Sequence, residues 1–348
     1  MMRLINHGSD QKSCCSFSRP SRHIFCPDCH DDDYGCLSPI IRRLVGPSDA
    51  LPFLSSFSKL SEGTEMAGYK DPQWKFLLAG SDTEPHALLS SDGLLDGAVV
   101  KVNLDDSNFG LGMVLVDPKH RGKGYAKALI RSAMETKPGK DQRCVLAICT
   151  ALGQPVYRKL GFQDSGTITS MSSTASDVLN SNPPRRPVDL SVMPGKECSQ
   201  EQLDTLARLD GNATGRNRKG RIELLVKASY AEEDGSRSTV AFVGNKSAAV
   251  ARQDCVGGPL IVGPVVGEEE DVPAMVWALV RKHFEGNEEC AKDVIVQMMV
   301  VNHSSLVSML EVEGMKLGGS LPSMTSDGES VYNKGDGSYW AMMHPSLG

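Results

Sequence analysis

The 348-residue chain has few aromatic residues, no long apolar run and no excess of positive charge. Phe, Trp and Tyr make up 5% of it, and the formal net charge is -6. A basic stripe interleaved with aromatic side chains, typical of a nucleic-acid surface, is missing. No segment approaches the roughly 18 consecutive apolar residues of a membrane-spanning helix. The sequence therefore predicts that neither a nucleic acid nor a membrane is the partner.

Two common phosphate-binding motifs are absent as well. The sequence contains no G-x-x-x-x-G-K-[ST] loop and no G-x-G-x-x-G fingerprint. The hydrophobic share of 40% is normal for a folded protein, and the length fits about two domains. We expect a cytoplasmic protein. The Arg and Ser content of residues 3–22 suggests an organelle-targeting leader, but no amphipathic stripe supports it.

A glycine-rich, basic elbow is the most informative feature that the chain does have. Apolar residues up to Val116 predict a buried strand, Pro118 ends it, and apolar residues at helical spacing predict a helix from Ala126. The turn between them contains Arg121, Gly122, Lys123 and Gly124. Free backbone N–H groups at such a helix start, beside basic side chains, predict a site for a phosphate or pyrophosphate. An ordinary strand-to-helix turn is the alternative.

A second pattern follows downstream of this helix. Residues 143–149 read as another buried strand, and they are followed by a short helix that ends in Tyr157-Arg158-Lys159-Leu160-Gly161-Phe162. Gly161 is expected to cap the helix C-terminus, and Phe162 to anchor it in the core.

Together the two patterns resemble the GNAT superfamily of acyl-CoA-dependent N-acetyltransferases. The elbow is similar to the family's R-x-x-G-x-G/A pyrophosphate loop, with Arg121, Gly124 and Ala126 at its three defining positions. The downstream pattern is similar to the family's closing Tyr-x-x-Leu-Gly-Phe motif. The resemblance implies an α/β fold with a mixed sheet flanked by helices, acetyl-CoA as co-substrate and no metal.

The resemblance also assigns roles to residues. It implies that Tyr157 protonates the leaving thiolate, although packing of the helix is the alternative role for this tyrosine. It places the oxyanion against backbone N–H groups near Leu115 and Val116, freed by a bulge in the strand. The predicted acyl-CoA site as a whole consists of Val114, Leu115, Val116, Arg121, Gly122, Lys123, Gly124, Tyr125 and Ala126.

Other choices stay open at this level. The base that deprotonates the amine is Glu62, Glu65 or Asp117, or a water chain, and all three carboxylates also fit a solvated surface. The predicted acceptor is an amine of a small metabolite or an amino acid. A non-catalytic acyl-CoA sensor is the alternative, since it would keep the elbow without needing Tyr157.

The first 38 residues differ in composition from the rest. They hold five of the ten cysteines, including the C-x-x-C-H pattern of Cys26 to His30, which fits haem attachment or half of a zinc site. Their polarity and terminal position favour an extension without a packed core. We therefore predict no metal site here.

Domain boundaries follow from the order of predicted elements. Residues 39–178 are expected to form the catalytic domain, with strands at 40–44, 74–79 and 98–102 and a helix at 50–59. A Ser, Thr, Asn and Pro-rich linker is expected at 179–187.

Residues 188–348 read as a second domain that repeats the order of the first. Strands are expected at 188–192, 238–243, 247–252, 259–266 and 293–301, with helices at 199–209 and 273–283 and a short helix that ends at Gly314. The region resembles the C-terminal domain of tandem GNAT proteins, through Asn212-Ala213-Thr214-Gly215, Arg218 and Ile261-x-Gly263-Pro264. Residues 262–266 lack a basic residue and a G-x-G elbow, so we expect this copy not to bind acetyl-CoA but to close the acceptor site or mediate oligomerisation. Asn302 is expected to cap the helix after it.

Overall fold

The structure is a computed structural model, and it describes residues 22–24, 40–62, 64, 70–136, 142–181, 191–227, 238–254, 257–301, 304–330, 332 and 338–342. Several predictions lie outside these residues: the C-x-x-C-H pattern, most of the linker at 179–187, the base candidate Glu65 and the capping role of Asn302.

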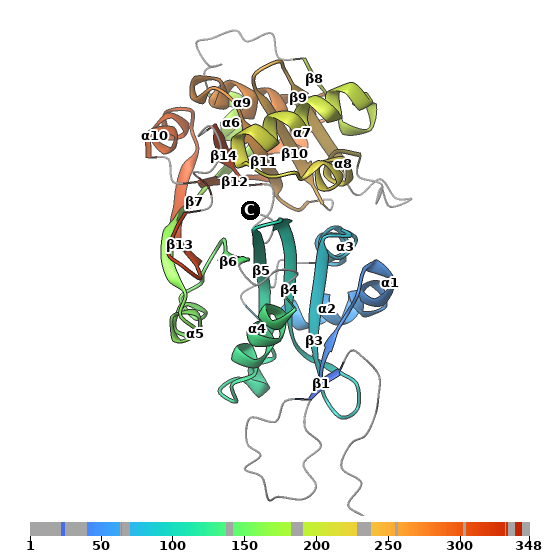
Figure 1. The fold of residues 1–348 in the computed structure, drawn as a ribbon. Helices are drawn as coiled ribbons and strands as arrows, with labels where there is room; N and C mark the ends of the chain where they lie inside the picture. Colours follow the sequence, from blue (N-terminus) through green and yellow to red (C-terminus); the bar gives the residue numbers. More distant parts are fainter. Residues whose placement is uncertain are drawn as a thin grey trace, which may run out of the picture.

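Fourteen strands of the described chain form one continuous mixed sheet, and helices pack against it (Figure 1). The strand order is β1-β2-β3-β4-β5-β6-β13-β7-β12-β14-β11-β10-β9-β8. The strands are β1 Arg22–Ile24, β2 Ile40–Arg43, β3 Thr83–Leu89, β4 Leu95–Asp105, β5 Asn108–Val116, β6 Arg143–Leu146, β7 Gln163–Thr174, β8 Val192–Pro194, β9 Ser238–Val243, β10 Ala248–Gln253, β11 Leu260–Val266, β12 Ile295–Val301, β13 Lys316–Thr325 and β14 Tyr339–Ala341. The helices are α1 Pro47–Ala50, α2 Leu54–Glu62, α3 Asp71–Leu78, α4 Tyr125–Glu135, α5 Gln154–Lys159, α6 Ala175–Asn180, α7 Gln200–Thr214, α8 Lys219–Lys227, α9 Val272–His283 and α10 Ser304–Val312.

The first half of the sheet consists of strands β1 to β6. It is antiparallel from β2 to β5, and β6 then pairs parallel to β5. Helix α4 is amphipathic, and it buries Ala128, Leu129, Ile130 and Ala133 against this part of the sheet. Gly124, in the left-handed region at φ 80°, is the residue before its first turn. The predicted strand, elbow and helix are thus confirmed.

The two halves of the sheet are joined by an exchange of strands. The late strand β13 lies between β6 and β7, and β7 in turn pairs with β12 along residues 168–174. Figure 1 shows β7 and β13 running side by side from α5 to the second half. A strand from residues 316–325 thus lies between two strands from residues 143–174.

The second half repeats the first in its central strands. β11 and β12 are parallel over three residue pairs, as β5 and β6 are. β9 and β10 form the predicted hairpin, and α9 packs on it. Ser199 caps α7 through a capping box with Gln202, as its sequence position indicates.

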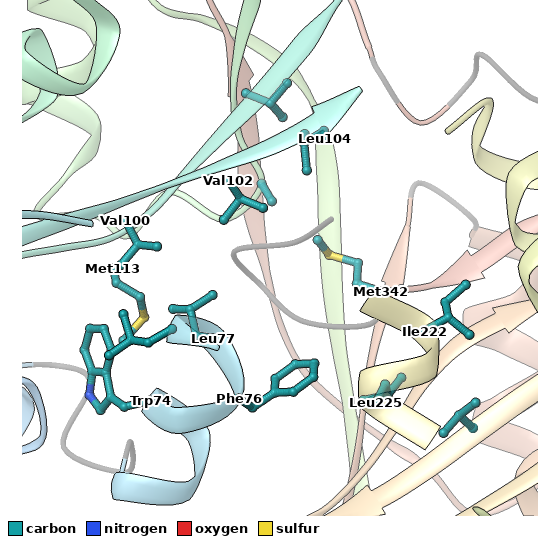
Figure 2. Close-up of a cluster of buried hydrophobic side chains, with 14 of the residues drawn as sticks. Trp74, Phe76, Leu77, Val100, Val102, Leu104, Met113, Ile222, Leu225 and Met342 are labelled. Atoms are coloured by element: carbon teal, nitrogen blue, oxygen red, sulfur yellow. The ribbon is translucent and has the colours of Figure 1, made fainter. Parts of the chain in front are cut away.

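A shared apolar core joins the two halves. Figure 2 shows Phe76 of α3 beside Ile222 and Leu225 of α8 and beside Met342 from the end of the chain. Arg221 of α8 reinforces this contact, because its buried guanidinium donates to the carbonyl oxygen of Phe76 at 2.9 Å. Such carbonyls at a helix C-terminus lack partners within the helix, so a cation there is stabilising.

Arg221 also leaves no room for a side chain at Gly80, two residues after the end of α3. It pairs with Asp82 and donates to the hydroxyl of Thr83 at 2.6 Å. A Cβ atom on Gly80 would lie 1.7 Å from Nη2 of Arg221. The absence of a side chain at Gly80 is what allows the arginine to reach the first half.

Some predicted elements differ from the structure. The strand expected at 74–79 is wrong: these residues lie in or directly after α3, which begins at Asp71-Pro72 and buries Trp74, Leu77 and Leu78 at helical spacing. The helix expected at 50–59 begins earlier, at Pro47, and a 3-10 turn at Leu51–Phe53 divides it. Of the strand expected at 188–192, only Val192 lies in a strand, β8; residue 191 does not, and residues 188–190 lie outside the described chain. The sequence analysis missed β3, α8, β13 and β14.

Candidate functional site

A cavity of about 610 Å³ opens where β5 and β6 separate. The two strands pair in parallel over three residue pairs, from Asn108 to Gly110 on β5. Beyond this point β5 continues to Val116, whereas the chain after β6 turns away through Ile148 and Thr150. The backbone of 111–116 therefore borders the cavity instead of a neighbouring strand, and its polar groups on that edge can pair with a ligand.

A β-bulge lies in the part of β5 that borders the cavity. The register with β4 passes from Leu115 opposite Ala98 directly to Gly112 opposite Val100. Met113, within the bulge, has a φ of 52°, which is rare for a residue with a side chain. The expected bulge is therefore present in β5, but the residues without a partner on β4 are Met113 and Val114, while Leu115 and Val116 keep theirs.

The glycine elbow forms one end of the cavity. Gly122 and Gly124 have φ values of 82° and 80°, and a Cβ atom on either would meet no atom within 4 Å. The first N–H groups of α4 have no partner within the helix and lie beside this open space. Positive φ and open space together make the elbow a place where a bulky anionic group can approach the backbone.

The side chains around the cavity carry positive charge. The cationic side chains Arg121, Lys127 and Lys159 line it together with the imidazole of His120, and no Asp or Glu of the described chain lines it. The Nε of Arg121 donates to the carbonyl oxygen of Val116 at 3.2 Å, which holds the side chain across the elbow. The cavity thus suits a ligand with several negative charges.

His120 was not singled out from the sequence, because a histidine in a basic turn has no distinctive pattern. Its Nδ1 lies 3.2 Å from Oδ2 of Asp96 at the start of β4. Burial raises the pKa of the Asp96 carboxyl. The contact is close but is not a hydrogen bond, because Nδ1 of His120 has no hydrogen-bond partner within the described structure.

Tyr157 lies in the wall opposite β5. It belongs to α5, its side chain is buried, and it lines the cavity together with Gly153 and Val156. Its ring packs edge to face on Phe162, with the ring centroids 6.2 Å apart. Gly161, at φ 92°, ends the helix as expected. The tyrosine therefore has both a packing role and a position at the cavity.

The predicted site residues come together around this one cavity. Eight of the nine predicted acyl-CoA residues line it: Val114, Leu115, Val116, Arg121, Gly122, Gly124, Tyr125 and Ala126. Lys123 is exposed and is not part of the lining. Sequence reasoning missed Thr64, Leu111 and Ile148, which are apolar or neutral residues without a motif.

The predicted bases are not placed at the cavity. Glu62, at the end of α2, is exposed and pairs with Lys70 at 3.8 Å. Asp117 caps the turn after β5 by accepting from the backbone N–H of Lys119 at 2.8 Å. Neither carboxylate lines the cavity.

Two further properties hold for the part of the chain that the structure describes. No group of three or more His, Cys, Asp or Glu side chains there could hold a metal ion. None of the helices there is long and apolar enough to cross a membrane.

The corresponding place in the second half is filled by the chain itself. Beyond its three parallel pairs with β12, β11 pairs instead with β14, at Val265 and Val266. Ala341 of β14 also lies opposite Val300 of β12. The indole N–H of Trp340 donates to the carbonyl oxygen of Gly267 at 2.6 Å. A strand thus lies between β11 and β12 where a cavity lies between β5 and β6.

Comparisons with known proteins agree with this geometry. Residues 86–164 match the family described as Acetyltransferase (GNAT) domain, a range that contains β5, the elbow, α4 and α5. No curated protein sequence matches the chain.

Solved structures share the fold over most of the chain. A protein from Pyrococcus horikoshii named as a candidate acetyltransferase has a TM-score of 0.61 at 13% identity, over 92% of this chain and 99% of its own. A tandem GNAT protein from the clavulanic acid biosynthesis pathway has a TM-score of 0.60 at 13% identity, over 82% and 98%. A fungal enzyme with a glucosamine N-acetyltransferase region has a TM-score of 0.56 at 12% identity, over 85% and 39%.

The class of the protein follows from these matches. Residues 86–164 match a GNAT acetyltransferase domain, and the chain has the mixed α/β fold of tandem GNAT proteins, with one sheet spanning both halves. GNAT domains use acyl-CoA, so the cavity with its glycine elbow is the place to test for this ligand.

Proposed function

We propose that this protein is an N-acetyltransferase that transfers an acetyl group from acetyl-CoA to the amine of a small metabolite or an amino acid. The observation that carries this proposal is the cavity between β5 and β6, which both the glycine elbow and Tyr157 line. A pyrophosphate needs the elbow's N–H groups and positive charge, and a thioester needs a proton donor for its sulfur.

Each part of the cavity has a place in this reaction. The elbow and Arg121 bind the pyrophosphate, and the backbone of 111–116 pairs with the arm that carries the thioester. A neutral amine attacks the carbonyl carbon, and backbone N–H groups beside the bulge stabilise the negative oxygen that forms. The C–S bond then breaks, the thiolate takes a proton from Tyr157, and the product nitrogen loses one proton to solvent, from which Tyr157 regains its own.

The second half is proposed to have no acyl-CoA site of its own. β14 fills the gap between β11 and β12, and residues 262–266 lack a basic residue and a G-x-G elbow. Its contribution is β13, whose Pro322 accepts from the backbone N–H of Cys149 at 2.9 Å, between the lining residues Ile148 and Thr150. The proposed division places the catalytic domain at residues 39–178 and the supporting domain at 188–348.

Calorimetric titration of acetyl-CoA into the protein and into Gly124→Glu tests the donor site. The wild type should bind with micromolar affinity, and the variant should not bind, because the new carboxylate enters the open space of the elbow. Gly93→Glu is the matched control: Gly93 has a φ of 81° and equally open space, but it lies in the turn between β3 and β4. This control should bind normally.

Release of free thiol in the presence of candidate amines tests the reaction itself. Turnover with an amine and binding at the elbow together support the enzyme. Binding without turnover across amino acids, polyamines and peptide N-termini would instead support a sensor of acyl-CoA. Equal binding by the wild type and Gly124→Glu would remove the elbow from the site.

A further inference from the structure

A buried arginine without a hydrogen-bond partner lies at the junction between the two halves. The loop between α7 and α8 turns at Gly215 and sends Arg216 and Arg218 inward, where their side chains are 2% and 5% exposed. Arg218 is neutralised, because its Nε donates to Oδ2 of Asp210 at 2.9 Å. Within the described structure Arg216 has only a longer ion pair, with Asp105.

Arg216 keeps unused donors despite its burial. Its Nη1 and Nη2 are buried and make no hydrogen bond within the described structure. The nearest acidic oxygen is Oδ2 of Asp105, 3.9 Å from Nε, which is beyond hydrogen-bond distance. Asp105 accepts instead from Asn108 at 2.8 Å and from the backbone N–H of Ser107 at 2.7 Å. Burying a guanidinium whose terminal N–H groups lack acceptors costs free energy of folding, so the groups around Arg216 decide whether this cost is offset.

Two tyrosine hydroxyls share this environment. The rings of Tyr332 and Tyr339 stack with their centroids 6.5 Å apart, and Cζ of Arg216 lies 5.9 Å from the centroid of Tyr332. Neither hydroxyl makes a hydrogen bond of good geometry within the described structure, although Ser323 lies close to the hydroxyl of Tyr332 and Arg218 close to that of Tyr339. Burial raises the pKa of both phenols, so both stay protonated and able to donate.

The unused groups are all able to donate, and the missing group is therefore an acceptor. Arg218 beside Arg216 adds a second positive charge, and burial lowers the pKa of Arg216. A negative acceptor at this point would satisfy the guanidinium and the hydroxyls together. Because these groups are closed off from solvent, a small anion with few charges fits better than a phosphate.

We propose that Arg216, with the hydroxyls of Tyr332 and Tyr339, binds a small monovalent anion of the chloride type at the junction of the two halves. This site is separate from the cavity between β5 and β6, and its occupation does not depend on acyl transfer. The anion ties the α7–α8 loop to residues near the end of the chain. Its role is to stabilise the junction.

Thermal unfolding in sodium chloride and in sodium gluconate at equal ionic strength tests the proposal, since gluconate is too large for a closed site. The wild type should melt a few degrees higher in chloride, with a response that saturates. Arg216→Gln should lose this difference. Arg208→Gln, at an exposed position on α7, is the matched control and should keep it.

Crystals soaked in sodium bromide provide a readout that needs no variant. An anomalous peak beside Nη1 and Nη2 of Arg216 would support the site, even if Arg216→Gln fails to fold. Equal melting of the wild type in both salts, without such a peak, would overturn it. An equal chloride response in wild type and Arg216→Gln would show a general salt effect and would also overturn it.

Discussion

The ring of Tyr157 lies against the backbone of Gly153, one helical turn earlier. A Cβ atom on Gly153 would lie 2.6 Å from Cε2 of the ring and 3.0 Å from its hydroxyl oxygen. No heavy atom fits at such a distance, so glycine at 153 sets where the tyrosine ring can lie. The position of the proposed proton donor therefore depends on a residue that carries no functional group.

Replacing Tyr157 by Phe tests the role of the hydroxyl. We expect turnover to fall by about 100-fold, as for loss of a general acid, with little change in acetyl-CoA affinity. The ring and its contact with Phe162 remain, so the melting temperature should stay close to that of the wild type. Thiol-release kinetics and calorimetry measure the two effects separately, and an unchanged rate would leave Tyr157 with its packing role alone.

Gly153→Ala should act on the same step without removing the hydroxyl. The added methyl group pushes the ring out of its place, so we expect a loss of turnover of about tenfold or more. Acetyl-CoA affinity should change less than turnover. If the alanine variant turns over at the normal rate, the ring position does not matter for the reaction.

The number of acetyl-CoA molecules bound per chain tests the proposal for the second half. We expect one, because β14 already pairs with both β11 and β12. Calorimetry of the wild type measures this number directly. Two equivalents per chain, or residual binding by Gly124→Glu, would show that the second half also accepts the ligand.

Acid should weaken the fold through His283. Burial lowers the pKa of this side chain from 6.5 to about 4, so the folded protein binds its proton less readily than the unfolded chain does. The free energy of unfolding should therefore decrease as the pH falls from about 6.5 to 4, by up to about 1.4 kcal/mol for each pKa unit. Denaturant unfolding of the wild type and His283→Gln across this range measures the effect. The variant should lose less stability than the wild type.

Gly80 and Arg221 should be coupled across the junction. Gly80→Ala places a methyl group on Nη2 of Arg221, and we expect a loss of about 1–3 kcal/mol. In an Arg221→Met background the same change should cost much less, which a double-mutant cycle measures. Gly220→Ala, where a Cβ would meet nothing within 4 Å, is the control and should not destabilise. Equal costs in both backgrounds would contradict the contact.

The sequence predicted the elements with strong local patterns. The elbow, α4, α5, α7 with its Ser199 cap and the β9–β10 hairpin were all predicted close to their observed positions. Residues 74–79 were mistaken for a strand because a short apolar run fits a strand as well as a helix. Asp71-Pro72, which is typical of a helix start, is the pattern that distinguishes the two. β14 has only three residues, and pairing with distant strands defines it.

The site was predictable to a similar extent. Residues in motifs, such as Arg121, Gly124 and Tyr157, line the cavity as a group. Gly153 and His120 line the cavity because of how the chain folds in space, and no local sequence pattern indicates this. The buried Arg216 could not be found from the sequence either, because its missing partner is a property of the packed structure.

The exchange of β13 has a consequence for how the protein is made. A ribosome releases β6 and β7 well before β13, which begins at Lys316 and must lie between them. The early half of the nascent chain therefore cannot finish its sheet as a self-sufficient unit, although domains commonly fold in the order of their synthesis. The wall behind Ile148 and Thr150 therefore closes only after β13 has been synthesised, later than all the residues that line the cavity.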